Sequence, residues 1–154
     1  MRILLTGGAG YVGSACLRWL LERGHDPIAY DNLTEGNRAA VPGAPERLIV
    51  GDIADTDALA GALRSRGVEA VMHFAALASV PASVADPESY YRVNVGGTKG
   101  VLDAMRAAGV GRIVFSSTCA TYGFTAEMPL QPDTLRRAYA ALVGTTPPVP
   151  RAGT

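Results

Sequence analysis

Three glycines spaced G-x-x-G-x-x-G, at Gly7, Gly10 and Gly13, follow directly on a short apolar run. That run predicts a buried strand over Arg2–Thr6, and the residues from Tyr11 onward predict a helix. The unpaired N–H groups at such a helix N-terminus carry partial positive charge, and residues without side chains let a pyrophosphate come close to them. The turn therefore predicts a fold in which the first strand leads into a phosphate-binding helix.

A carboxylate ends the next apolar run. Pro27–Tyr30 predicts a second strand, and Asp31 follows it, 18 residues after Gly13. An acid at this point accepts hydrogen bonds from the hydroxyl groups of an adenine ribose and repels a 2′-phosphate. The neighbouring Asn32 and Leu33 supply no arginine to receive such a phosphate. These features predict binding of NAD rather than NADP, and the alternative is a turn and helix cap without a ligand.

Strand-like and helix-like segments alternate along the first 116 residues. Strands are predicted at Arg2–Thr6, Pro27–Tyr30, Arg47–Val50, Ala70–Phe74 and Arg112–Ser116. Helices are predicted at Tyr11–Arg23, with an apolar side of Val12, Cys16, Trp19 and Leu20, at Thr56–Arg66, and at Pro87–Ala108. This alternation predicts an α/β fold with a Rossmann-type, doubly wound parallel sheet.

Composition excludes several classes of function. The chain of 154 residues is 48% apolar and 18% charged, and its 14 basic and 14 acidic residues cancel. We therefore expect no nucleic-acid partner and no membrane association. Cys16 and Cys119 match no metal-ligand or disulfide pattern, so no metal is expected. Reduced thiols and the lack of a signal peptide at the start predict a cytoplasmic protein.

Six motifs extend along the first 123 residues: Thr6–Ser14 (TGGAGYVGS), Tyr30–Arg38 (YDNLTEGNR), Gly51–Asp55 (GDIAD), His73–Val80 (HFAALASV), Asp86–Thr98 (DPESYYRVNVGGT) and Ile113–Gly123 (IVFSSTCATYG). Together they resemble the extended short-chain dehydrogenase/reductase family and, within it, the N-terminal half of the UDP-glucose 4-epimerases. The resemblance implies an NAD-binding Rossmann domain over residues 1–123, a UDP-sugar substrate in the complete family, and a homodimer through helix 87–108.

The resemblance also implies individual site residues. Those implied to bind NAD are Gly7, Gly10, Tyr11, Val12, Gly13, Asp31, Asn32, Leu33, Gly36, Asp52, Ile53, Phe74, Ala75, Ala76, Leu77, Asn94 and Ser116. Thr118 is the implied catalytic residue, with its hydroxyl on the 4-oxygen of the sugar. Simpler roles remain open for some of these positions, since Asp52 could cap a loop. We interpret His73 as a partly buried strand residue rather than a base, and Tyr90 and Tyr91 as packing residues.

Members of this family transfer hydride from sugar C4 to NAD⁺ and back to the other face, with the tyrosine of a Y-x-x-x-K motif as the base. The chain has no such motif. Lys99 is its only lysine and follows Val95 by four residues, and Tyr139 is followed four residues later by Val143. The related dehydratases carry an acid pair where this chain has Cys119–Ala120, which disfavours dehydration.

The chain is accordingly interpreted as truncated before a C-terminal substrate domain, with residues 124–154 forming a divergent tail that is disordered or, from Leu135, read out of frame. The alternative is a natural split protein that a second chain completes. The predicted function is that of an NAD-dependent nucleotide-sugar epimerase, most like UDP-glucose/UDP-galactose 4-epimerisation, and inactive as this chain. The other readings are a non-catalytic NAD-binding fragment or half-enzyme, and another extended epimerase or dehydratase of the same family.

Overall fold

The protein is represented by a computed structural model that describes residues 1–118. The first compact unit is Met1–Ser116, and a second unit begins at Ser117. The dipeptide Cys119–Ala120, Tyr139 and the whole predicted tail of residues 124–154 lie outside the described residues.

The first unit is built on a sheet of five parallel strands in the order β3-β2-β1-β4-β5. The strands are β1 (Arg2–Thr6), β2 (Asp26–Asp31), β3 (Leu48–Val50), β4 (Ala70–His73) and β5 (Ile113–Phe115). Strand β1 is central, with Leu4 beside Ile28 of β2 on one side and beside Val71 of β4 on the other. The predicted doubly wound parallel sheet is confirmed, and each predicted strand is found within two residues of its expected bounds.

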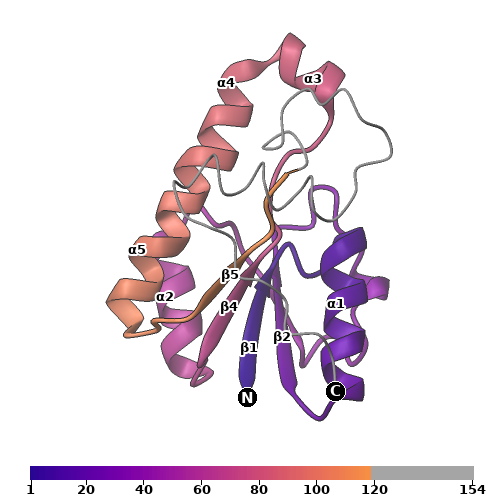
Figure 1. The fold of residues 1–154 in the computed structure, drawn as a ribbon, viewed down its shortest axis with the longest axis vertical. Coiled ribbons are helices and arrows are strands. Elements are labelled where there is room, and N and C mark those ends of the chain that lie inside the picture. The colour runs from indigo at the N-terminus through magenta and orange to yellow at the C-terminus, as the bar shows by residue number, and fades with distance from the viewer. Residues whose placement is uncertain (119–154) are drawn as a thin grey trace, which may run out of the picture. The chain divides into compact units, whose positions relative to one another are not determined.

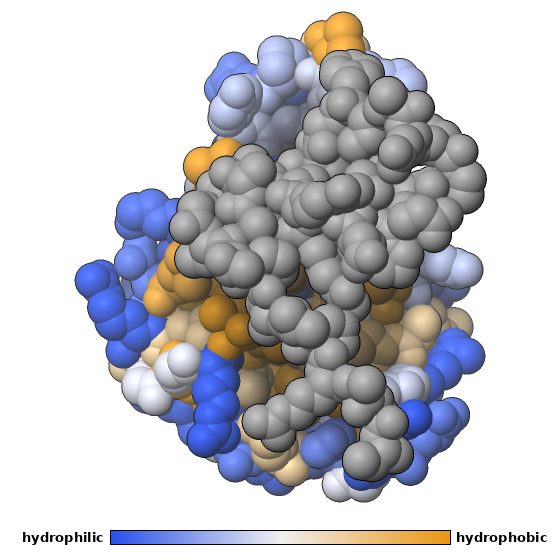
Figure 2. Space-filling view, in the orientation of Figure 1, coloured by the Kyte–Doolittle hydropathy of each residue, from blue (hydrophilic) through white to orange (hydrophobic). Residues whose placement is uncertain are grey.

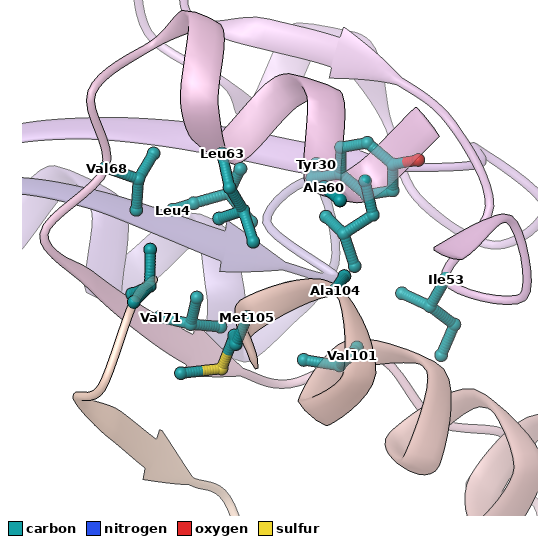
Figure 3. Packing of buried hydrophobic residues seen from close by; sticks show 12 residues of the cluster. Leu4, Tyr30, Ile53, Ala60, Leu63, Val68, Val71, Val101, Ala104 and Met105 are labelled. Atoms are coloured by element: carbon teal, nitrogen blue, oxygen red, sulfur yellow. The ribbon is translucent and has the colours of Figure 1, made fainter. Parts of the chain in front are cut away.

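Helices cover both faces of the sheet, as Figure 1 shows. Helix α1 (Tyr11–Glu22) covers one face, where the core includes Ile3 and Leu5 of β1. Helices α2 (Thr56–Ser65) and α5 (Thr98–Ala108) cover the other face, where Leu4 lies in a cluster with Leu63 and Val101 (Figure 3). Alternate residues of β1 therefore enter opposite cores, as the pleat of a strand requires.

The buried side of α1 differs from the predicted stripe. Leu17 and Leu20 are buried, and Gly13 and Ser14 are buried beside them. In contrast, Val12 is 57% exposed and Trp19 is 50% exposed, with the Arg23 guanidinium stacked 3.6 Å from the centre of the Trp19 ring. Only Leu20 of the predicted stripe is fully buried, because the small residues of α1, rather than its largest ones, lie against the turn after β1.

The predicted helix over residues 87–108 is helical throughout but not uniform. It consists of α4 (Pro87–Tyr90), a π-helical segment η2 (Tyr91–Gly97) and α5. The Asp86 side chain caps its start, accepting from Ser89 N–H at 3.2 Å. Gly109, in the left-handed region at φ 72°, ends it. Two short elements were not predicted, α3 (Val80–Ala85) and the 3₁₀ turn η1 (Arg38–Ala40).

Apolar surface remains along strand β5. Ile113, Val114 and Phe115 are 38%, 56% and 55% exposed. Figure 2 shows hydrophobic surface gathered over the sheet, with hydrophilic side chains around its margin. Among the described residues, β5 therefore forms an edge of the sheet with little cover on its side chains.

Candidate functional site

Strands β1, β2 and β4 end at the same edge of the sheet, at Thr6, Asp31 and His73. Successive strands are added on one side of β1 as far as β3, and then on its other side from β4. A crevice opens beyond the carboxyl ends of the strands where the chain changes sides in this way, and ligands bind there in α/β proteins. The glycine turn lies at this point, between β1 and α1.

The glycine turn is packed too closely for side chains. Gly7 has φ 69°, and a Cβ on it would lie 2.6 Å from Ala75 N. A Cβ on Gly13 would overlap Gly7 O, so the turn allows α1 to approach it only because both residues lack side chains. Gly8, which is not in the list of residues implied to bind NAD, fills a similar position against Ala29 of β2.

The N-terminus of α1 is open to a ligand. Its cap residue Gly10 has no side chain, and its first turn holds no acidic residue. The N–H groups of Tyr11, Val12 and Gly13 precede the first residue that can find a carbonyl within the helix, Ser14, which donates to Gly10 O at 2.9 Å. The Tyr11 side chain is 93% exposed and leaves the approach uncovered. The cradle of backbone groups fits a pyrophosphate.

Asp31 is 8% exposed, and two backbone donors hold its carboxylate. Ala9 N–H donates to Oδ2 at 2.9 Å, and Leu33 N–H donates to Oδ1 at 2.8 Å. A Cβ on Gly36 would lie 2.5 Å from Asp31 Oδ1, so the loop after β2 closes tightly over the acid. Each carboxylate oxygen can accept a second hydrogen bond, which leaves Asp31 able to receive ribose hydroxyl groups.

Asp52 caps its loop, the simpler role that the sequence left open. Its Oδ1 accepts from Ala54 N–H at 2.9 Å and its Oδ2 from Asn32 Nδ2 at 2.9 Å. The Ala54 hydrogen bond, and then that from Asn32, lower the pKa of this carboxyl below its ordinary value. The side chain is exposed, and a charged acceptor remains beside the end of β2.

Ile53 belongs to the core by its side chain. It is 7% exposed and lies at the end of the cluster beside the helix that carries Val101 (Figure 3). A Cβ on Gly97 would lie 2.5 Å from Ile53 Cδ1, and one on Gly100 would lie 2.8 Å from Ile53 O. A ligand can therefore meet Ile53 only at its backbone.

The segment after β4, Phe74–Leu77, has no regular secondary structure, and the helical run Pro87–Ala108, formed by α4, η2 and α5, holds it in place. Leu77 N–H donates to Asn94 Oδ1 at 2.8 Å, and Asn94 Nδ2 donates to Leu77 O at 3.0 Å. One turn earlier, Tyr90 Oη donates to Ser79 O at 2.7 Å. Tyr90 thus makes a specific hydrogen bond, and Tyr91 is 72% exposed rather than packed in the core of the described unit.

His73 is buried, 2% exposed, and both ring nitrogens are hydrogen-bonded, in agreement with its interpretation as a strand residue. Its Nε2 lies 3.0 Å from Thr98 Oγ1, which donates to Asn94 O at 2.6 Å, so Nε2 carries the proton. Its Nδ1 then accepts from the hydroxyl of Thr6 at 2.5 Å. Burial lowers the pKa of His73, which favours this neutral form.

The two residues expected near the nicotinamide are both exposed. Ser116 ends the first unit, and its N–H donates to His73 O at 3.1 Å, which brings it to the carboxyl edge of β4. Thr118 belongs to the second unit. The structure therefore brings together the predicted residues from Gly7 to Ser116 along one edge of the sheet, whereas the residue predicted to be catalytic, Thr118, belongs to the other unit.

Three contributors were not predicted: Ala9, Thr6 and Thr98. Ala9 acts through its backbone, which no side-chain pattern reveals. The two threonines flank the buried His73. The signal that could have found Thr6 is a single histidine on an apolar strand, together with a threonine at the end of the neighbouring strand. In the part of the chain described here, no group of three or more His, Cys, Asp or Glu could hold a metal ion. No helix of those residues is long and apolar enough to cross a membrane.

Comparison with known proteins finds one family model and curated relatives with a common name. A sequence model of the NAD dependent epimerase/dehydratase family matches residues 3–143, which extends beyond Gly123, where the six motifs end. UDP-glucose 4-epimerase of Corynebacterium glutamicum is 50% identical over 147 residues, 92% of this chain and 43% of the relative. That of Streptomyces lividans is 48% identical over 130 residues, 84% of this chain and 39% of the relative.

A solved structure shares the fold as well. UDP-glucose 4-epimerase from Stenotrophomonas maltophila, with bound NAD and formylated UDP-arabinopyranose, has a TM-score of 0.80 and 30% sequence identity. The match covers 94% of this chain and 47% of that one. The chain thus spans less than half the length of each of these three relatives.

Proposed function

The chain belongs to the NAD dependent epimerase/dehydratase family, and we propose that residues 1–118 hold an NAD molecule along the carboxyl edge of the sheet. The observation that carries the proposal is the pairing of the open glycine turn with the Asp31 carboxylate. Ala9 N–H donates to Asp31 Oδ2, so the phosphate cradle and the ribose acceptor form one rigid unit. The resolved complex of the Stenotrophomonas relative with NAD supports the same assignment.

Each part of the cofactor has its own set of protein groups in this proposal. The backbone N–H groups of Tyr11 and Val12 hold the pyrophosphate at the start of α1. Asp31 accepts the adenine ribose hydroxyls, with Asn32, Leu33 and Gly36 closing the loop around it. Asp52 and the backbone of Ile53 flank the adenine. Phe74, Ala75, Ala76 and Leu77 line the path to the nicotinamide, with Ser116 beside its end. Bound NAD supplies a hydride acceptor.

The complete reaction belongs to the whole protein. We assign it as epimerisation of a nucleotide sugar, most like interconversion of UDP-glucose and UDP-galactose, because both curated relatives described above carry that name. Thr118 would hydrogen-bond the sugar's 4-oxygen. The Y-x-x-x-K pair that serves as base is absent from the sequence, so a chain of these 154 residues alone binds the cofactor without turning over a sugar.

Two alternatives differ in what completes the site. In the first, the chain is a non-catalytic NAD-binding module or one half of a split enzyme whose other chain supplies the base. In the second, it belongs to another nucleotide-sugar epimerase or dehydratase of the family. Cys119–Ala120 stand where dehydratases carry an acid pair, which favours epimerisation.

A homodimer is the proposed assembly, formed through the helical run Pro87–Ala108. Three apolar side chains on this run remain exposed: Tyr91 at 72%, Val95 at 61% and Leu102 at 48%. Tyr91 and Val95 lie four residues apart within the π-helical segment η2, which places them on one side of it, and Leu102 lies farther along in α5. A second copy of the chain would bury them.

Titration calorimetry with NADH and with NADPH tests the binding proposal. We expect NADH to bind and NADPH to bind at least about tenfold more weakly, because Asp31 repels the 2′-phosphate. Equal affinity for both would contradict the assignment of Asp31, and no binding of either at millimolar concentration would overturn the proposal. A coupled assay for UDP-galactose conversion then separates a cofactor-binding chain from an active epimerase.

A further inference from the structure

A polar path connects the segment after β4 with the glycine turn, and it passes through the π-helical segment η2. The Asn94 carboxamide pairs with both backbone groups of Leu77, at 2.8 and 3.0 Å. The Asn94 carbonyl accepts from Thr98, and Thr98 accepts from His73. His73 accepts from the hydroxyl of Thr6, the residue before Gly7. Every side chain in this path lies between two parts of the proposed cofactor site.

We infer that Asn94 is a positioning residue that holds Phe74–Leu77 in place. Its amide pairs with both the N–H and the C=O group of Leu77, as a neighbouring strand would, instead of reaching the cofactor. The inference rests on the proposed function for what this segment lines. It assigns Asn94 a different task from the direct contact that the sequence resemblance implies.

The irregular backbone of this segment gives the pairing its importance. Residues 74–79 belong to no helix or strand, so their N–H and C=O groups need partners from elsewhere. Phe74 N–H donates to Thr6 O at 2.9 Å, and Leu77 and Ser79 are held from the helical run. A segment with three such anchors keeps one conformation, and removing the central anchor frees the residues on both sides.

The amide itself fixes which end of Asn94 faces which backbone group. An N–H donor and a C=O acceptor of one residue require an oxygen and an NH₂ opposite them, so only one orientation of the carboxamide satisfies both. The pair is half-buried, which makes an unmatched donor or acceptor there unfavourable.

The π-helical segment explains how one helix serves both the core and the site. Bonds from residue i to i+5 hold one more residue per turn than an α-helix, so the side chains before the segment are rotated relative to those after it. Tyr90 and Asn94 thereby face the segment after β4, while Val101, Ala104 and Met105 face the core. π-Helical turns occur often at functional sites.

Amide hydrogen exchange of Leu77 in the cofactor-free chain, followed by NMR, tests the inference directly. We expect protection in the wild type and its loss in Asn94→Ala. Asn94→Asp keeps an oxygen that accepts from Leu77 N–H but sets a second oxygen against Leu77 O, so we expect exchange of that amide to be faster than in the wild type and slower than in Asn94→Ala. Arg92→Lys, in the same π-helical segment and exposed, is the matched control and should leave Leu77 protected.

NADH affinity provides the second measurement. We expect Asn94→Ala to weaken NADH binding about tenfold and Tyr90→Phe, which removes one hydrogen bond and keeps the ring, to weaken it less. Loss of affinity with Leu77 still protected would mean that Asn94 contacts the cofactor, and the inference would be wrong. Unchanged exchange in Asn94→Ala would overturn it as well.

The two proposals fail separately. A wild-type chain that ignores NADH refutes the proposed function, whereas Leu77 exchange is measured without cofactor and still decides whether Asn94 holds this segment. Circular dichroism of each variant checks that it is folded. If Asn94→Ala does not fold, Leu77 exchange in Asn94→Asp decides, and exchange as slow as in the wild type would overturn the inference.

Discussion

Ala9 N–H donates a 2.9 Å hydrogen bond to Asp31 Oδ2, which joins the turn after β1 to the end of β2. The same carboxylate accepts from Leu33 N–H through its other oxygen. The acid expected to hold a ribose therefore also orders the two loops on either side of it. Stability and cofactor affinity depend on the same side chain at this position.

Asp31→Asn tests this double role. An amide offers one acceptor in place of two and turns an NH₂ group towards one of the two backbone donors. We expect the free energy of unfolding to fall by about 1–3 kcal/mol and NADH affinity to fall about tenfold or more. Urea unfolding and calorimetry measure the two effects. Glu46→Gln, which neutralises an exposed acid in the loop before β3, is the control and should change neither. Full stability in Asp31→Asn would show that the two N–H bonds are unimportant.

Gly13→Ala tests the close approach of α1 to the glycine turn. The added Cβ would overlap Gly7 O, so the helix must move away from the turn. We expect a loss of about 1–3 kcal/mol in unfolding free energy together with weaker NADH binding. The matched control is Gly61→Ala in α2, where a Cβ meets nothing within 4 Å. That change should stabilise the protein by about 0.5–1 kcal/mol. If both variants behaved alike, crowding at Gly13 would be disproved.

The buried His73 predicts a dependence of stability on pH. Burial lowers its pKa in the folded chain below the ordinary value of about 6.5. The unfolded chain therefore binds a proton that the folded chain does not, as pH falls below about 6.5. We expect the stabilising contribution of neutral His73 to be complete above that pH and to disappear as pH falls towards the folded pKa.

Urea unfolding of the wild type and of His73→Gln at several pH values between about 5 and 8 measures this contribution. The slope of stability against pH should be smaller in the variant. His25→Gln, which changes the other of the two histidines, should keep the wild-type slope. A wild-type slope in His73→Gln would assign the pH dependence to other groups.

The proposed dimer predicts an effect of charge on the exposed apolar side of the helical run. Val95→Arg places a cation where a second copy would bury an apolar side chain, and unpaired buried charge is strongly unfavourable. Sedimentation velocity should show a shift from dimer to monomer. Val50→Arg, at a 52% exposed position on β3, is the matched control and should leave assembly unchanged. A wild-type chain that sediments as a monomer at high concentration would contradict the dimer.

Sequence patterns predicted the strands well because each is a short apolar run bounded by turn residues, as at Arg2–Thr6. The glycine turn and Asp31 were equally evident, since their spacing reflects local backbone geometry. Strand order was not predictable in detail, because the registers of β1 with β2 and β4 depend on contacts between distant segments.

Other features depend on tertiary packing that local sequence does not record. Helix α1 has two apolar sides, and the one with Leu17 and Leu20 is buried because Gly13 and Ser14 are small enough to lie against the turn. The π-helical segment has no sequence signal, since the choice between i+4 and i+5 bonding is decided by what Asn94 and Gly97 contact. The resemblance implied Asn94 as a cofactor contact, and the poor helix propensity of asparagine indicates that it has a partner but not which one.

The central position of β1 has a practical consequence. This strand starts at Arg2, at the end of the sheet opposite to the glycine turn, and Met1 is 47% exposed there (Figure 1). A purification tag or fluorescent reporter fused before Met1 would project from the end of the sheet opposite to the glycine turn. Immobilising the chain by such a fusion would keep the crevice beyond Thr6 turned towards the solution, so ligand binding can be followed on a surface without obstructing it.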